Sequence, residues 1–158
     1  MMILVVEDDA NKANQLLEVL RTDAPGFSIE VRRSYQSGLK EANASRPALI
    51  LLDMSMPTFD VSPQEKGWKT RPYAGREILL ELRRKAIPSK VIVVTQFESF
   101  GEGPGSLSLD ELREQLEVTF APQYAGTIFY RSAASAWRVE LGSLLRSTLG
   151  LGRPGEKL

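Results

Sequence analysis

Hydrophobic residues along the chain gather in short uninterrupted runs, each bounded by polar or structure-breaking residues. Such runs are typical of strands that are buried on both faces of a sheet. Apolar and polar side chains alternate over residues 27–33, which predicts a strand exposed on one face, at an edge of the sheet. The buried strands are predicted at residues 2–6, 48–53, 90–95 and 126–130.

Between these runs, apolar residues recur at the spacing of amphipathic helices. The first helix follows Asp9 or Asn11, either of which can cap its start, and ends near Thr22. Further helices are predicted at residues 35–44, 75–85, 108–118, where Ser108 opens a capping box, and 137–148. Five strands alternating with five helices predict an α/β fold with a doubly wound, five-stranded parallel sheet of order 2-1-3-4-5.

One connection is long for such a fold. Residues 54–74 are polar and rich in proline, and their Trp68 and Tyr73 could form a partial lid over the sheet or simply anchor a solvated loop. Residues 101–106 are predicted to be a flexible loop. They do not form a dinucleotide-binding motif, because Pro104 lacks an amide donor. Residues 1–150 are expected to form one domain, and residues 151–158 a short polar tail.

Composition narrows the chemistry. The 158 residues include 20 basic and 20 acidic side chains, so the zero net charge argues against direct nucleic-acid binding through a basic surface. No apolar run is long enough to span a membrane and no signal peptide is evident. With no cysteine present either, we expect a cytoplasmic protein. The absence of histidine excludes a Ser-His-Asp triad and an ordinary zinc site.

Carboxylates stand where the predicted strands end. Glu7 and Asp8 follow the first strand, Asp53 ends the third, and Thr95 ends the fourth. Taken alone, Asp53 could be a functional carboxylate or a turn former. In a sheet of order 2-1-3-4-5 the switch point lies between strands one and three, so the three carboxylates should converge there. Carboxylates crowded together recruit a cation or acquire raised pKa values, and magnesium is the expected ion.

Three segments together resemble the receiver domains of two-component response regulators: residues 3–9, 49–57 and 91–95. The resemblance spans almost the whole chain and implies the flavodoxin-like receiver fold. It implies that Asp53 accepts a phosphoryl group from a histidine kinase or phosphotransfer protein. By the same resemblance, Glu7, Asp8, Asp53 and the backbone carbonyl of Ser55 hold Mg²⁺, and the Thr95 hydroxyl moves onto the phosphoryl group.

The chain departs from the family at the end of the fifth strand. The family carries lysine and proline there, whereas residues 129–133 read Phe-Tyr-Arg-Ser-Ala. Either Tyr130 takes the place of the lysine, or Arg131 supplies the positive charge and turns inward when the site is phosphorylated. Arginine is longer and planar, so it is not an equivalent replacement. The aromatic switch residue of the family would fall on Thr127 or Ile128, and neither is aromatic. The sequence therefore does not establish that this chain uses the output switch of the family.

The main hypothesis is a stand-alone receiver domain, a phosphorylation-dependent signalling switch for an unknown downstream protein rather than an enzyme. An alternative is a degenerate receiver that binds a partner constitutively, with vestigial acids. A third is an aspartate-nucleophile phosphatase resembling the haloacid dehalogenase-like enzymes. Those enzymes need a second acid two residues after the nucleophile, and Ser55 stands at that position.

Overall fold

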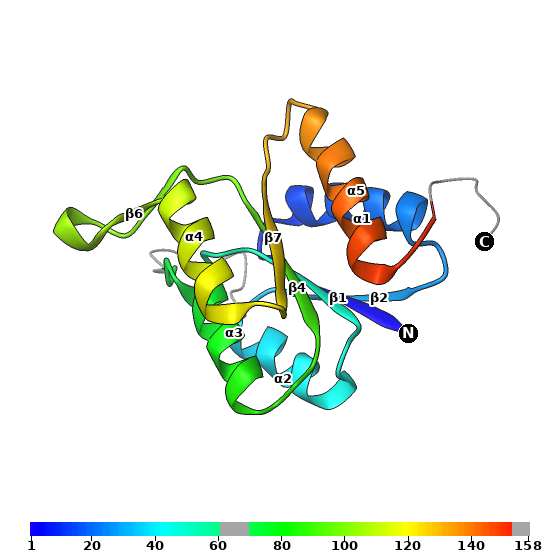
Figure 1. The fold of residues 1–158 in the computed structure, drawn as a ribbon, viewed down its shortest axis with the longest axis horizontal. Coiled ribbons are helices and arrows are strands. Elements are labelled where there is room, and N and C mark those ends of the chain that lie inside the picture. The colour runs from blue at the N-terminus through cyan, green and yellow to red at the C-terminus, as the bar shows by residue number, and fades with distance from the viewer. Residues whose placement is uncertain (61–69, 153–158) are drawn as a thin grey trace.

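The protein folds into a five-stranded parallel sheet with helices on both faces (Figure 1). The structure is a computed structural model and describes residues 1–60 and 70–152. Its strand order, β2-β1-β3-β4-β7, is the predicted 2-1-3-4-5 once the two short strands of a separate hairpin are set aside. The sheet strands are β1 (Met2–Val6), β2 (Ser28–Arg32), β3 (Leu49–Leu52), β4 (Lys90–Thr95) and β7 (Tyr124–Phe129).

Five helices cover the two faces of the sheet, and alternate strand residues face each layer (Figure 1). Ile3 and Val5 pack with α1 and α5, whereas Leu4 and Val6 pack with the other helices. This explains why the central strands are continuously apolar, since both of their faces are buried. The helices are α1 (Ala10–Asp23), α2 (Tyr35–Ser45), α3 (Ala74–Arg84), α4 (Leu109–Phe120) and α5 (Ala136–Leu149).

Two helix starts are set by side-chain caps that the sequence indicated. Asp9 caps α1, because its carboxylate accepts the backbone N–H of Asn11 at 2.9 Å and of Lys12 at 3.1 Å. Asp9 is therefore the cap, and Asn11 is not. Ser108 and Glu111 form the predicted capping box at the start of α4. The cap on α1 matters for the site, because it sets where the first turn of that helix begins.

The predicted loop at residues 101–106 is more ordered than expected. Strands β5 (Ser99–Phe100) and β6 (Leu107–Ser108) pair antiparallel around a 3₁₀ turn, Gly103–Gly105, and the resulting hairpin projects beside α4 (Figure 1). Phe100 is buried, and its carbonyl accepts a 2.8 Å hydrogen bond from the Tyr73 hydroxyl. These contacts hold the hairpin to the segment before α3. Tertiary packing thus explains an order that local sequence did not indicate.

The long connection after β3 is closed by backbone hydrogen bonds. Met56 and Arg71 form an antiparallel bridge, with N–H to carbonyl distances of 3.3 and 2.8 Å. Trp68, one of the two aromatic residues considered for a lid, lies outside the described residues. Tyr73, the other, is bonded to the hairpin as described above.

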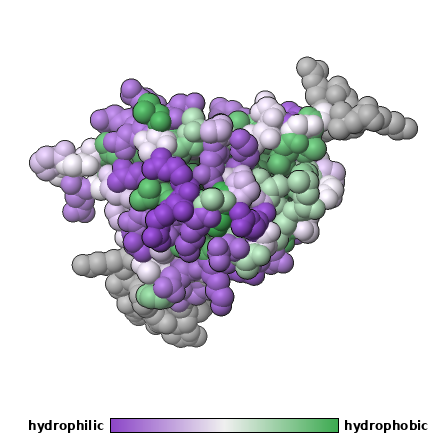
Figure 2. All heavy atoms as spheres, turned by 60° about the horizontal axis from the view of Figure 1, so that its bottom comes forward, coloured by the Kyte–Doolittle hydropathy of each residue, from purple (hydrophilic) through white to green (hydrophobic). Residues whose placement is uncertain are grey.

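The edge strand β2 is partly exposed along its length, as its alternating sequence predicts. Figure 2 shows a mostly hydrophilic surface on the side of the molecule that comes forward from the bottom of Figure 1.

In the described part of the chain, none of the helices has the length and apolar character that crossing a membrane requires.

Candidate functional site

Three acidic side chains meet at the carboxyl ends of β1 and β3, as the sequence predicts. Glu7 and Asp8 follow β1 and Asp53 follows β3, and the parallel pairing of these strands brings their ends to one edge. One carboxylate oxygen of each residue lies within 4.8 Å of the others. Glu7 and Asp53 are almost fully buried, at 2% and 3% exposure, whereas Asp8 is half-buried.

The Asp53 carboxylate is held on both oxygens. Its Oδ1 accepts the Met54 backbone N–H at 2.7 Å, and its Oδ2 lies 3.2 Å from the Lys12 ammonium. Helix α3 comes close behind it, because the Gly75 N–H bonds to the Met54 carbonyl at 2.9 Å. A Cβ atom on Gly75 would lie only 2.7 Å from the Asp53 carbonyl oxygen. Glycine is therefore required for this approach of α3 to the strand end.

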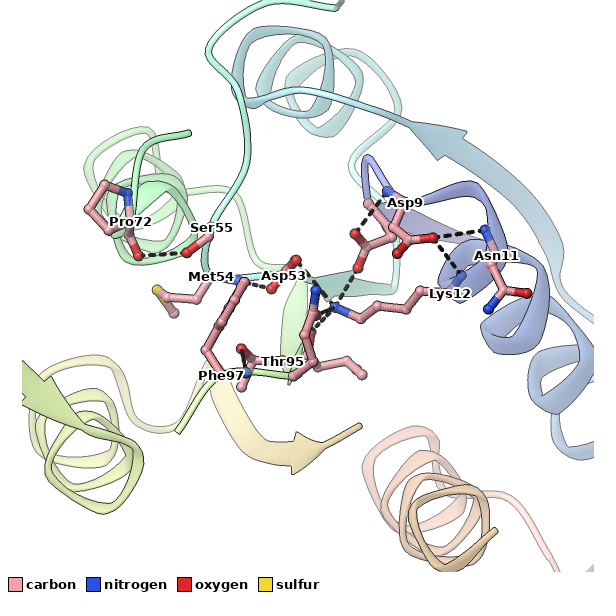
Figure 3. A network of polar contacts seen from close by, with 12 residues as sticks. Asp9, Asn11, Lys12, Asp53, Met54, Ser55, Pro72, Thr95 and Phe97 are labelled. Atoms are coloured by element: carbon pink, nitrogen blue, oxygen red, sulfur yellow. Dashed lines mark hydrogen bonds and ion pairs between the residues drawn. The ribbon is translucent and has the colours of Figure 1, made fainter. Parts of the chain in front are cut away.

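Lys12, on the first turn of α1, is a site residue that the sequence reasoning missed. Its side chain is fully buried, and its Nζ lies 2.5 Å from Glu7 Oε1 as well as beside Asp53 (Figure 3). A signal was present in the sequence, because Lys12 stands four residues before Leu16 and eight before Leu20. That spacing places it on the apolar face of its helix, where a lysine is out of place unless it is paired.

Burial and charge shift the pKa values of the two buried acids upwards. Burial raises the pKa of Glu7 to about 8, with a further increase from the charge on Asp53, while Lys12 opposes both. Burial also raises the pKa of Asp53, again against the lowering effect of Lys12. Both buried carboxyl groups therefore hold their protons more tightly than exposed ones do, while the Lys12 ammonium favours their ionised forms.

Two other predicted residues border this cluster. Thr95 is completely buried at the end of β4, the strand next to β3, and its hydroxyl oxygen accepts the Phe97 N–H at 3.2 Å. The Ser55 hydroxyl donates to the Pro72 carbonyl at 3.3 Å (Figure 3). The hydroxyl proton of Thr95 is not used in its bond with Phe97, so it can be donated to another acceptor.

At the end of β7, Tyr130 is the residue that faces the site. The Tyr130 ring is buried, and its centroid lies 5.6 Å from the Lys12 ammonium. The Arg131 side chain is 64% exposed, with its guanidinium 3.4 Å from Glu98 and stacked over the Phe129 ring. The structure therefore does not bring Arg131 to Asp53, and its predicted inward turn on phosphorylation stays a prediction.

Comparison with known proteins identifies the family. The chain is 33% identical over 144 residues to the uncharacterized protein y4jR of Sinorhizobium fredii, covering 89% of this chain and 94% of that protein. It is 26% identical over 143 residues to the Detocs response regulatory protein DtcB of Enterobacter cloacae, covering 89% and 95%. The crystal structure of a phosphorylated cyanobacterial phytochrome response regulator, RcpA, superimposes with a TM-score of 0.65 at 20% identity, covering 98% of both chains. The chain belongs to the receiver-domain family of response regulators.

This receiver domain is not matched by any protein-family model. It has the strand order β2-β1-β3-β4-β7 and an acidic cluster at the carboxyl ends of β1 and β3. Receiver domains are signalling domains rather than classical enzymes. Receiver domains typically bind Mg²⁺ at an acidic pocket, and Glu7, Asp8 and Asp53 form an acidic cluster in this structure.

Proposed function

We propose that this receiver domain is a phosphorylation-dependent signalling switch with Asp53 as its phosphoacceptor. The observation that carries the proposal is the setting of Asp53, a buried carboxylate at the carboxyl end of β3 that lies among Glu7, Asp8 and the Lys12 ammonium. Ligands of doubly wound sheets bind beyond the carboxyl ends of the strands, at the switch point between strand directions. β1 and β3 flank that point in this sheet.

The proposed reaction is transfer from a phosphohistidine of a histidine kinase or phosphotransfer protein. A carboxylate oxygen of Asp53 donates an electron pair to phosphorus. The P–N bond then breaks, and its electrons stay on the imidazole nitrogen. The products are an acyl phosphate on Asp53 and a histidine free of phosphate. The protein contributes mainly by positioning the carboxylate and neutralising charge on the phosphoryl oxygens.

A divalent cation fits the donors at this site. Glu7, Asp8 and Asp53 offer only carboxylate oxygens, which are the ligands that Mg²⁺ prefers, and the Ser55 backbone carbonyl is the proposed fourth donor. When bound, the ion supplies positive charge to the transferring phosphoryl group.

Thr95 gives the phosphorylated site a connection to the rest of the fold. Its hydroxyl can donate to a phosphoryl oxygen while still accepting the Phe97 N–H. Phosphorylation of Asp53 would therefore change the position of the segment after β4. Arg131 is proposed as an additional cation that approaches once phosphate is present, at the cost of its exposed contact with Glu98. A downstream protein that reads this segment is the proposed output.

A second candidate function is a constitutive protein-binding module with an unused acidic pocket. It is favoured by the outward orientation of Arg131 and by the missing lysine at the end of β7. The two functions differ in one measurable property, which is whether Asp53 takes up a phosphoryl group.

The test is intact-mass measurement after incubation with phosphoramidate and Mg²⁺. We expect one phosphoryl group on the wild-type protein and none on Asp53→Asn, because an amide is not a nucleophile of comparable strength. Asp110→Asn, which changes an exposed acid at the start of α4, is the matched control and should be phosphorylated like the wild type. Uptake of phosphate on Ser55 or Thr95, or no uptake at all, would contradict the proposal.

A further inference from the structure

Lys12 places a positive charge inside the protein, where such a charge needs a specific reason. Among the residues that the structure describes, it is the only lysine or arginine whose side chain is buried, with an exposure of 0%. An isolated buried ammonium is strongly destabilising unless it is paired and hydrogen-bonded. A lysine that only packed its carbon chain would extend its ammonium to water instead.

The Lys12 ammonium is surrounded by acceptors. Beyond the two carboxylates, it donates to the Val94 carbonyl at 2.7 Å and to Gln96 Oε1 at 2.9 Å. The three N–H donors of the ammonium thus have backbone, amide and carboxylate partners from three different segments. The side chain crosses from α1 over the sheet edge to the segment after β4 (Figure 3). This is a built site, in which every donor has an acceptor.

The Lys12 ammonium lies near the end of β7, the place from which a lysine of the receiver family would supply positive charge to the phosphoryl group. β7 pairs with β4, and the Tyr130 N–H bonds to the Thr95 carbonyl at 2.8 Å, so Tyr130 stands beside the phosphorylation site. Its side chain carries no positive charge, and its ring lies against the Lys12 ammonium. Tyr130, where the family would have a lysine, is therefore adjacent to the ammonium of Lys12 on α1.

We propose that Lys12 is a catalytic residue that performs, from helix α1, the charge-pairing role of the lysine missing from the end of β7. Before transfer, its ammonium orients the Asp53 carboxylate. During transfer, it pairs with a phosphoryl oxygen as negative charge gathers there. This inference rests on the proposed function, and it assigns the principal protein cation of the site to Lys12 rather than to Arg131.

The same contacts give Lys12 a second effect, on the end of β4 and the segment that follows it. A phosphoryl oxygen would become a new acceptor for the ammonium, which now bonds to Val94 and Gln96. The bonds to that segment would then be redistributed when Asp53 is phosphorylated. Thr95 would act on the same segment through Phe97, so two independent side chains connect it to the phosphoryl group.

The test compares initial rates of phosphorylation by phosphoramidate, with Mg²⁺ present, in folded variants checked by circular dichroism. Lys12→Met should lower the rate by about 100-fold, as expected for removal of a pre-positioned charge partner. Lys12→Arg should fall between that variant and the wild type, because the charge remains but the shape differs. Lys85→Met, the same change at an exposed residue, should leave the rate unchanged.

A double variant that moves the lysine from α1 to the end of β7 distinguishes an electrostatic role of Lys12 from a structural one. In Lys12→Met/Tyr130→Lys the ammonium returns from the end of β7, and the rate should recover at least about tenfold over Lys12→Met. A purely structural role for Lys12 predicts no recovery. If Lys12→Met does not fold, the rates of Lys12→Arg and the double variant decide the question.

A spectroscopic measurement follows the ammonium itself. With ¹⁵N-labelled lysine, the Lys12 Nζ resonance should shift when Asp53 is phosphorylated, whereas the Lys85 resonance should not. An unshifted Lys12 resonance, a wild-type rate in folded Lys12→Met, or a larger loss of rate in Arg131→Met than in Lys12→Met would overturn the inference. Each of these results leaves Asp53 as the acceptor. A wild-type protein that takes up no phosphate would instead overturn the proposed function and this inference with it.

Discussion

Two regions at the carboxyl edge of the sheet differ in where their charged side chains lie, buried in one region and exposed in the other. At the ends of β1 and β3, Glu7 and Asp53 are buried and share the Lys12 ammonium. At the end of β7, the charged residue Arg131 stays in water beside Glu98. The difference follows from what each end offers. The first has two carboxyl groups, the Val94 carbonyl and an amide oxygen within reach, whereas β7 is followed by Tyr130, whose ring centroid lies 4.8 Å from that of Trp137.

The comparison teaches that a charged side chain can be buried where hydrogen-bond acceptors and opposite charges surround it. The element on which the side chain stands matters less. α1 begins immediately after the acids of β1, because Asp9 caps it, and Lys12 therefore lies one turn above the pocket. From there its side chain reaches the site without leaving the protein.

Stability should separate the two ends most strongly. Lys12→Met is expected to lower the free energy of unfolding by about 3–5 kcal/mol, because it leaves Asp53 without its counter-charge in a buried place. Arg131→Met should change it by no more than about 0.5 kcal/mol, since that pair is exposed. Urea unfolding at pH 7 with EDTA measures both. Equal effects of the two substitutions would remove the contrast between the two ends.

The pH dependence of stability should reveal the proton on Glu7. The folded protein keeps this proton up to about pH 8, whereas the unfolded chain releases it near the ordinary value of 4.5. The resulting stabilisation is complete at low pH and is lost as pH rises through the folded pKa. The free energy of unfolding should therefore fall by up to about 3–4 kcal/mol between pH 5 and pH 8.

Glu7→Gln, which mimics the protonated acid, should flatten this slope when unfolding is measured without metal. The exposed Glu114→Gln should retain it. A Glu7→Gln slope equal to that of the wild type would mean that Glu7 is ionised in the folded protein throughout this range.

Magnesium should produce the smallest of these effects. An ion that binds only the folded protein, at ten times its dissociation constant, stabilises by about 1.4 kcal/mol. Asp8→Asn should abolish this gain in thermal unfolding, whereas Asp110→Asn should keep it. Lys12→Met should enlarge it, because the ammonium and the ion draw on the same oxygens of Glu7 and Asp53. An unchanged magnesium response in Asp8→Asn would place the ion elsewhere.

The sequence by itself determined the strands, their order and the acidic cluster. Continuous apolar runs identify strands buried on both faces, and parallel strands with short helical crossovers leave few topologies. Once the order was known, Glu7, Asp8 and Asp53 had to meet at one edge, as they do. The Asp9 cap and the Ser108 capping box were equally readable, because they depend on neighbours within a few residues.

Tertiary structure alone decided which cation reaches Asp53. The resemblance to receiver domains pointed to Arg131, beside the expected lysine position at the end of the last strand. Lys12 is 41 positions before Asp53 and gains its partners only when α1 packs against the sheet. The hairpin of residues 99–108 was missed for the same reason, since a buried Phe100 and the Tyr73 hydroxyl hold it. Local pattern specifies elements. The partners of a long, flexible side chain are set by packing between segments that are distant in the sequence.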